Sequence, residues 1–285
     1  MKPFCQTSII FGVLISAIAV VRGLKKKTLS RSGAAAAFCV GFLSVGSGLR
    51  GFVLLMFYQI ASSATKYKKN LKEVYDATAA EDSVRGAPQV LACSILAVIT
   101  SLVHTFKVGE ERSISYKDDW LAAALTCAVI AHHSTCLADT LASELGVLSK
   151  EPPILVIKPW MTVPPGTNGG VTVWGTFVSC IGGLCMGLGT ALMDYLSGIT
   201  PVQTMKLLLL GTVCGAIGSL IDSILGATLQ ITYQDPDTKM IHHTHKQTFK
   251  QISGINVLTN VQVNFVSVSF TMVLGGMIFG PMIFN

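Results

Sequence analysis

The chain has 285 residues, a formal net charge of +6, 51% hydrophobic residues and only 13% charged residues. This composition excludes an ordinary soluble domain, in which about 25% of residues are charged. It indicates an all-α polytopic membrane protein, a transmembrane helical bundle that forms a single integral membrane domain over residues 1–285. We expect the lipid bilayer as its surroundings and no nucleic-acid partner.

Apolar stretches of helical length predict eight membrane spans. The second and third are short, and only Gly48, Leu49, Arg50 and Gly51 separate them, so a single re-entrant hairpin is the alternative. The first stretch could also be a cleaved signal peptide, because Ala17-Ile18-Ala19 resembles a cleavage site. In chain order the stretches are residues 8–22, 33–48, 50–64, 88–106, 118–138, 171–193, 205–229 and 261–283.

Basic residues are unevenly divided between the loops of this eight-span arrangement. The loops after spans 1, 3, 5 and 7 carry fifteen of the 21 Lys and Arg residues, and the opposite side carries six. Since short cytoplasmic loops retain Lys and Arg, the richer side is expected to face the cytosol. Both termini would then be non-cytosolic, and we expect a multi-pass protein of the endoplasmic reticulum or another endomembrane.

The fifth span ends in a stretch, Asp139 to Gly146, that could hold a metal ion. Asp139, Ser143 and Gly146 recur at steps of four and three residues, which places them on one helical face. Glu144 is five positions from Asp139 and therefore rotated from it by roughly 140°. Glu144 could bind a second ion, support the following loop or face solvent.

A second acid, Asp222, lies inside an otherwise uncharged apolar run from Leu207 to Leu229. An ionised acid in hydrocarbon is costly, so such residues usually face a functional cavity, although a protonated structural acid is the alternative. The sequence around Asp222, Leu220 to Ile224, echoes Leu137 to Leu141 around Asp139. This echo predicts two helices that each deliver one carboxylate to a common depth.

The loop after the first acid contains Lys158 and the turn Pro164-Pro165-Gly166-Thr167-Asn168-Gly169-Gly170. Glycines let a backbone approach a ligand closely, and successive exposed amides can bind phosphate. The chain has no Walker sequence, so any phosphate site here is of another kind. An ordinary turn between two spans is the alternative.

Polar residues also mark the cytosolic ends of two other spans. One set is Ser62, Ser63, Thr65 and Lys66, and the other is Asn256, Asn260 and Asn264, which recur every four residues. Ligand contact and ordinary interhelical hydrogen bonding both explain these stripes. The loop that follows, Lys66 to Arg85, fits either an amphipathic helix on an anionic leaflet or a solvated linker.

At these residues the chain resembles the integral-membrane family that contains animal transmembrane protein 19 and the plant phytyl-phosphate kinase of vitamin E synthesis. One departure lies before the Gly-rich turn, where family members carry Lys or Arg and this chain has Thr162, so Lys158 need not be the equivalent cation. The resemblance spans about residues 29 to 264 and rests on five blocks: Leu29 to Ala34, Ser62 to Lys66, Asp139 to Gly146, Val163 to Thr172 with Gly175, and Gly218 to Gly226.

More distantly, the order of acid, serine, glycine and Gly-rich loop is similar to CTP-dependent lipid kinases and phosphatidate cytidylyltransferases. The resemblance implies phosphoryl transfer from CTP or another nucleoside triphosphate to a prenyl or polyprenyl monophosphate. Asp139 and Asp222 would be catalytic, and Mg²⁺ would be held by Asp139, Glu144 and Asp222. The residues expected to bind the nucleotide are Lys66, Ser143, Lys158, Gly166, Thr167, Asn168, Gly169, Gly170 and Asn260.

Three other functions fit the same features. A cytidylyltransferase that makes a CDP-lipid would use the same parts and differ only in the phosphate that is attacked. An ion-coupled transporter would explain the intramembrane Asp222 and the Gly-rich helices. A non-catalytic membrane protein would leave both acids and the Gly-rich loop unexplained.

Overall fold

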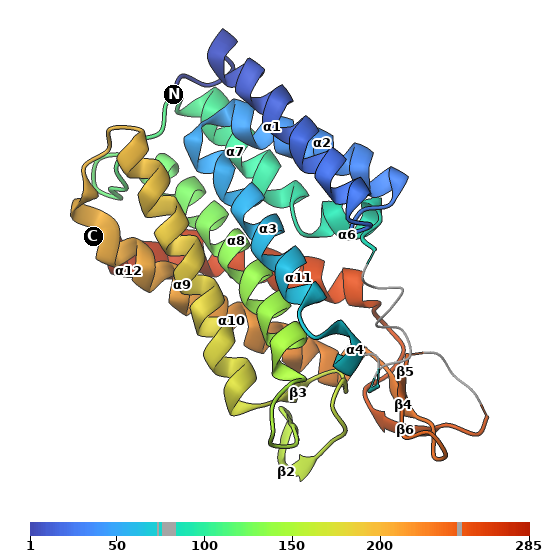
Figure 1. The fold of residues 1–285 in the computed structure, drawn as a ribbon. Helices are drawn as coiled ribbons and strands as arrows, with labels where there is room; N and C mark the ends of the chain where they lie inside the picture. The colour runs from blue at the N-terminus through green and yellow to red at the C-terminus, as the bar shows by residue number, and fades with distance from the viewer. Residues whose placement is uncertain (73, 76–83, 244–246) are drawn as a thin grey trace.

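The computed structural model describes residues 1–72, 74–75, 84–243 and 247–285 of the chain. Its fold is mainly helical, as predicted (Figure 1). Within the described part, five helical segments are long and apolar enough to cross a membrane. They are α1 (Gln6–Lys25), α8 (Trp120–Gly146), α9 (Val173–Leu196), α10 (Thr204–Leu229) with the short η2 (Pro201–Gln203) before it, and α11 (Asn260–Leu274) continued by η3 (Gly275–Phe279) and α12 (Gly280–Phe284).

The expected count of eight spans is therefore too high by the criterion of length. The second, third and fourth predicted spans are helical but short or broken. A 3₁₀ turn, η1 (Leu49–Gly51), separates α2 (Arg31–Ser47) from α3 (Phe52–Lys66), and a break at Cys93 and Ser94 divides the fourth span. Its two halves are α6 (Ala87–Ala92) and α7 (Ile95–Lys107).

In the described part of the loop from Lys66 to Arg85, residues Lys69–Lys72 form the short helix α4. The predicted amphipathic helix falls partly on residues 73 and 76–83, which lie outside the described residues.

Helix α8 forms the centre of the bundle and packs against α9, α10, α11, α3 and α7 (Figure 1). Small residues bring its neighbours close. A Cβ on Gly182 of α9 would meet the backbone of Ala138, and one on Gly218 of α10 would meet Thr135. Close approach of this kind is the usual basis of helix packing in membranes.

Side-chain caps explain where several helices begin. Asp119 accepts the Ala122 N–H at 3.0 Å at the start of α8, and Thr172 accepts the Gly175 N–H at 2.9 Å at the start of α9. Thr259 and Gln262 form a reciprocal capping box before α11. Each cap satisfies backbone donors that a helix leaves without an intrahelical partner.

Two small antiparallel sheets, which the sequence analysis did not predict, follow α8 and α10 at the same end of the bundle (Figure 1). The first has the order β2-β1-β3, and the second has the order β5-β4-β6. Their strands are β1 (Ile154–Leu155), β2 (Lys158–Thr162), β3 (Gly170–Val171), β4 (Thr232–Gln234), β5 (Ile241–His242) and β6 (Lys250–Ser253).

Candidate functional site

The two predicted acids come together between α8 and α10. Asp139 and Asp222 lie close enough for their charges to interact, with Asp222 buried and Asp139 partly exposed. One turn earlier Gly218 lies against Thr135, whose Oγ1 donates to the Cys214 carbonyl at 3.3 Å. Because the helices run in the same direction, a step of four residues along each leads from this contact to the two acids.

Helix α11 supplies the hydrogen-bond partners of Asp222. Ser267 Oγ donates to Asp222 Oδ2 at 2.9 Å. With its amide nitrogen facing acceptors, Asn264 donates to the same oxygen at 3.1 Å and to the Asn260 carbonyl at 3.2 Å. The asparagine stripe therefore reaches the site through Asn264, whereas the side chain of Asn260 is exposed. Sequence reasoning missed Ser267, because serines are common in membrane helices and nothing in its spacing sets it apart.

An open cavity of about 720 Å³ begins beside these acids and extends between α1, α2, α3 and α6. Thr140 and Asn264 lie at its border, so it reaches the immediate neighbour of Asp139 and a hydrogen-bond partner of Asp222. Most of its lining is apolar, and Arg85 and Gln89 add polar groups.

The Gly-rich turn docks on the end of the helix that carries Asp222. Gly166 and Gly169 have φ angles of +88° and +76°, a region that favours glycine. A Cβ on Gly169 would overlap Ala227, which is five residues beyond Asp222 on α10. The turn therefore needs glycine both for its own shape and for its contact with α10.

The expected row of free amides is largely engaged in holding this turn together. The N–H groups of Thr167 and Gly170 donate to Pro164 O at 3.2 Å and Thr167 O at 2.9 Å. Asn168 N–H donates to Thr232 Oγ1 at 3.2 Å, and the buried Thr167 hydroxyl donates to Pro164 O at 2.7 Å. A compact turn satisfies its polar backbone internally, so fewer donors face a ligand than the sequence suggested.

Other predicted residues, Lys66, Lys158 and Ser143, have other partners or are exposed. Lys66 Nζ donates to the Lys26 carbonyl at 2.8 Å, and Lys158 is exposed on β2. Ser143 is exposed, and its hydroxyl donates to the Asp139 carbonyl at 3.0 Å in its own helix. Among the described residues, neither lysine forms an ion pair with Asp139 or Asp222.

The sequence predicted that Asp139, Glu144 and Asp222 would together hold Mg²⁺. The described residues contain no group of three or more His, Cys, Asp or Glu side chains able to hold a metal, because Glu144 is rotated away from Asp139. Mg²⁺, however, is usually held by one or two carboxylates together with substrate phosphates. Asp139 and Asp222, two mutually interacting carboxylates beside a cavity, fit that smaller requirement.

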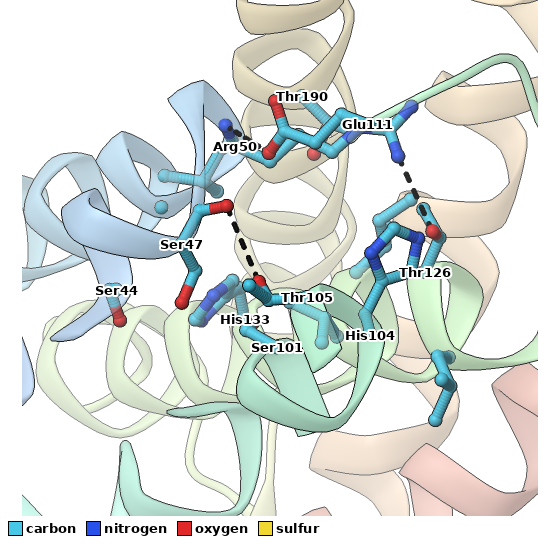
Figure 2. A pocket seen from close by; sticks show the side chains of 15 residues that line it. Ser44, Ser47, Arg50, Ser101, His104, Thr105, Glu111, Thr126, His133 and Thr190 are labelled. Carbon is cyan, nitrogen blue, oxygen red and sulfur yellow. Dashed lines mark hydrogen bonds between the residues drawn. The ribbon is translucent and has the colours of Figure 1, made fainter. Parts of the chain in front are cut away.

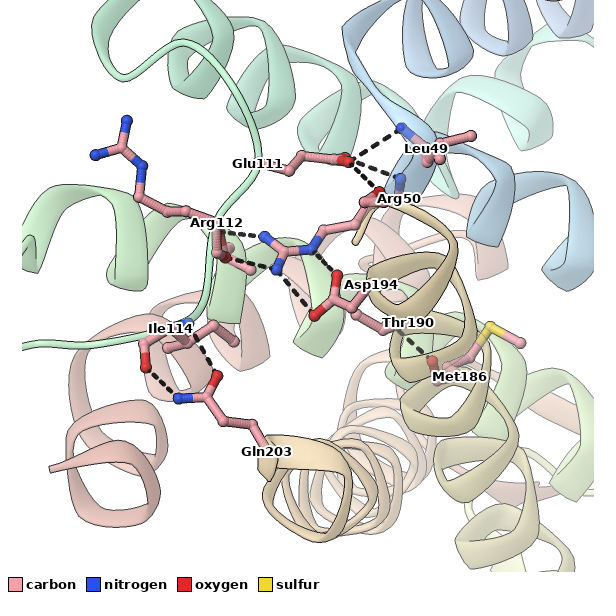
Figure 3. Close-up of polar contacts among 11 residues, drawn as sticks. Leu49, Arg50, Glu111, Arg112, Ile114, Met186, Thr190, Asp194 and Gln203 are labelled. Atoms are coloured by element: carbon pink, nitrogen blue, oxygen red, sulfur yellow. Dashed lines mark hydrogen bonds and ion pairs between the residues drawn. The ribbon is translucent and has the colours of Figure 1, made fainter. Parts of the chain in front are cut away.

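A second buried polar cluster lies at the opposite end of the bundle (Figure 3). Arg50 forms a bidentate pair with Asp194, from Nε to Oδ1 at 2.6 Å and from Nη2 to Oδ2 at 3.0 Å, and Arg50 Nη1 donates to Thr126 Oγ1 at 3.3 Å. Thr126 precedes Asp139 by thirteen positions on α8, which corresponds to roughly 20 Å. The sequence contained one signal for this cluster, an arginine in the short gap between two apolar stretches.

The long apolar helices with buried acids at their interfaces define a polytopic integral membrane protein. The chain matches the family described as integral membrane protein DUF92 over residues 14–272, and it belongs to that family. This assignment and the relatives below confirm the predicted family resemblance and the multi-pass membrane architecture.

Three relatives resemble the chain over most of its length. Protein PGR of Arabidopsis thaliana is 35% identical over 280 residues, covering 96% of this chain and 97% of that protein. An uncharacterised membrane protein of Methanocaldococcus jannaschii is 25% identical, covering 76% and 82% of the two chains. Another, from Synechocystis, is 28% identical, covering 80% and 81%. No solved structure matches the chain.

Proposed function

We propose that this protein is a lipid kinase of an endomembrane, which transfers a phosphoryl group from a nucleoside triphosphate to a prenyl or polyprenyl monophosphate. One observation carries the proposal: the acid pair Asp139 and Asp222 adjoins Thr140 and Asn264, which line a largely apolar cavity. An amphiphilic phosphate needs that combination, because its tail requires apolar surroundings and its head requires charge neutralisation beside them.

The acid pair would hold Mg²⁺, which would neutralise the repulsion between two anionic substrates and stabilise charge on the transferred group. Ser267 and Asn264 orient the Asp222 carboxylate through hydrogen bonds at 2.9 and 3.1 Å. Arg85, in the lining of the cavity, is suited to bind the acceptor phosphate, since a guanidinium matches phosphate geometry.

The reaction needs no strong general base. An oxygen of the acceptor monophosphate, already deprotonated, attacks the γ-phosphorus of the donor, and the bond from the γ-phosphorus to the bridging oxygen breaks. A lipid diphosphate and a nucleoside diphosphate result. CTP is the donor that we propose, with the exposed Lys158 and Asn260 on the side of the Gly-rich turn available to its phosphates.

The test uses purified protein in nanodiscs with Mg²⁺, labelled CTP or ATP, and geranylgeranyl monophosphate. We expect a lipid diphosphate, and we expect Asp139→Asn and Asp222→Asn each to lower the rate by about 100-fold or more. Glu144→Gln is the matched control on α8 and should keep the rate within about threefold, because Glu144 does not join the acid pair.

The products separate the rival functions. A CDP-lipid in place of the diphosphate would establish a cytidylyltransferase. If neither product forms, the enzymatic proposal is refuted. Full activity in Asp139→Asn would refute the site.

A further inference from the structure

A second cavity, of about 570 Å³, lies at the end of the bundle away from the acid pair and is lined by residues of α2, α3, α7, α8 and α9. Figure 2 shows the side chains that line it. Ten of its fifteen lining residues have polar side chains, including Arg50, Glu111, His104 and His133. Polar side chains between membrane helices are expensive and tend to be functional.

Two histidines in this lining have ring nitrogens without a partner. His104 and His133 are 8% and 3% exposed, and neither His104 Nε2 nor His133 Nδ1 has a hydrogen-bond partner within the described part of the chain. A neutral imidazole carries one acceptor nitrogen. Buried polar atoms are normally paired, so two unpaired ones beside an open space mark it as a candidate ligand site.

The charges around the cavity favour a cation. Arg50 is neutralised by its bidentate pair with Asp194, and Arg112 pairs with Asp119 at 3.2 Å. Within the described part of the chain Glu111 forms no ion pair, although Arg50 lies near it: its carboxylate accepts hydrogen bonds from the backbone N–H groups of Leu49 and Arg50 and lies 3.5 Å from Ser197 Oγ.

These five charged groups sum to a single negative charge, so the surroundings disfavour an anion such as phosphate. Burial raises the pKa of Glu111, and the nearby Arg50 and the backbone N–H groups of Arg50 and Leu49 oppose that shift only in part.

We propose that this cavity binds a small primary ammonium group, carried by a free amine or by an ethanolamine lipid headgroup. An ammonium supplies the missing positive charge to Glu111 and three N–H donors to the unpaired histidine nitrogens and nearby hydroxyls. Sodium supplies charge without donors. A quaternary ammonium lacks donors too, and the lining contains no Phe, Tyr or Trp to form an aromatic cage. The inference does not rest on the proposed kinase activity.

The test measures binding of ethanolamine to the full chain in phosphatidylcholine nanodiscs by isothermal titration calorimetry. Tetramethylammonium and sodium serve as comparison ligands, and nanodiscs containing phosphatidylethanolamine test the lipid source. We expect saturable binding of ethanolamine and much weaker binding of both comparison ions. Weaker apparent binding in phosphatidylethanolamine nanodiscs would identify the lipid headgroup as the ligand, and unchanged binding would identify the free amine.

Two variants address the site and one serves as the matched control. Glu111→Gln and His133→Phe should each weaken ethanolamine binding by about tenfold or more. His132→Phe changes the adjacent histidine of α8, which is equally buried but does not line the cavity, and should bind as the wild type does. If Glu111→Gln does not fold, His133→Phe decides alone. Absence of binding in both nanodisc types, equal binding of tetramethylammonium or sodium, or full affinity in His133→Phe would overturn the proposal.

Discussion

Arg50 and Asp194 are 144 residues apart in sequence and form a bidentate, buried ion pair in the structure. Arg50 belongs to η1, the turn between α2 and α3, and Asp194 belongs to the last turn of α9 (Figure 3). The pair therefore joins the first half of the chain to the second at the end of the bundle away from the acids. The guanidinium also donates to Thr126 Oγ1 and the Arg112 carbonyl, which leaves few of its donors free.

Asp194→Asn should lower the free energy of unfolding by about 3–5 kcal/mol, because it leaves a buried guanidinium without its counter-charge. Arg112→Ala, which breaks the exposed pair with Asp119, should change it by less than about 1 kcal/mol. Both values can be measured by denaturant titration in mixed micelles. Equal effects of the two substitutions would contradict a structural role for the buried pair.

Glu111 should make stability depend on pH. Burial, the larger effect, raises its pKa, while Arg50 and the backbone N–H groups of Leu49 and Arg50 act in the opposite direction. An acid whose folded pKa is raised stabilises the fold when protonated, so this contribution is complete below the unfolded value of about 4.3. It is lost as the pH rises through the raised folded value. The difference in free energy of unfolding between wild type and Glu111→Gln, measured across pH 4 to 8 without amines, should therefore change as the pH rises, with the wild type losing stability relative to the variant. A difference that does not change with pH would contradict this prediction.

The cavity beside the acid pair should be sensitive to volume at Ala37. This residue lines the cavity on α2, whereas Ala35, two positions earlier, is exposed. Ala37→Phe should raise the KM for long prenyl phosphates by about tenfold and affect short ones less, because the added ring occupies space that the tail needs. Ala35→Phe should leave both KM values unchanged. Equal KM changes for long and short substrates would argue against a tail in this cavity.

Gly169 should be far less tolerant of substitution than another glycine with positive φ. Gly169→Ala combines a φ of +76° with overlap on Ala227, whereas Gly109 has a φ of +94° and nothing within 4 Å of an added Cβ. Gly169→Ala should therefore lower the free energy of unfolding by about 1–3 kcal/mol more than Gly109→Ala does. Thermal unfolding gives the comparison, and limited proteolysis of the Gly-rich turn reports whether it has left α10.

Much of the membrane architecture could be predicted before any coordinates. A helix in the bilayer needs an apolar stretch of a length set by the thickness of the hydrocarbon core. All eight stretches predicted on this basis coincide with helices. The echo predicted that two helices each deliver one carboxylate to a common depth, and in the structure Asp139 and Asp222 lie close enough for their charges to interact. The break points were harder to predict, because hydropathy does not distinguish one span from two short helices joined by a turn.

Sequence alone determined the helical segments, the membrane class and the presence of two acids in apolar helices. These features follow from hydropathy and helical periodicity, which are local properties of a chain. Only the tertiary structure decided which polar groups meet. Helices that rotate and approach closely at small residues such as Gly218 bring Ser267 and Asn264 into hydrogen-bond contact with Asp222. The packing also pairs amides of the Gly-rich turn with other groups and brings Arg50 to Asp194. Those contacts depend on how distant helices pack, which residue spacing along one helix does not contain.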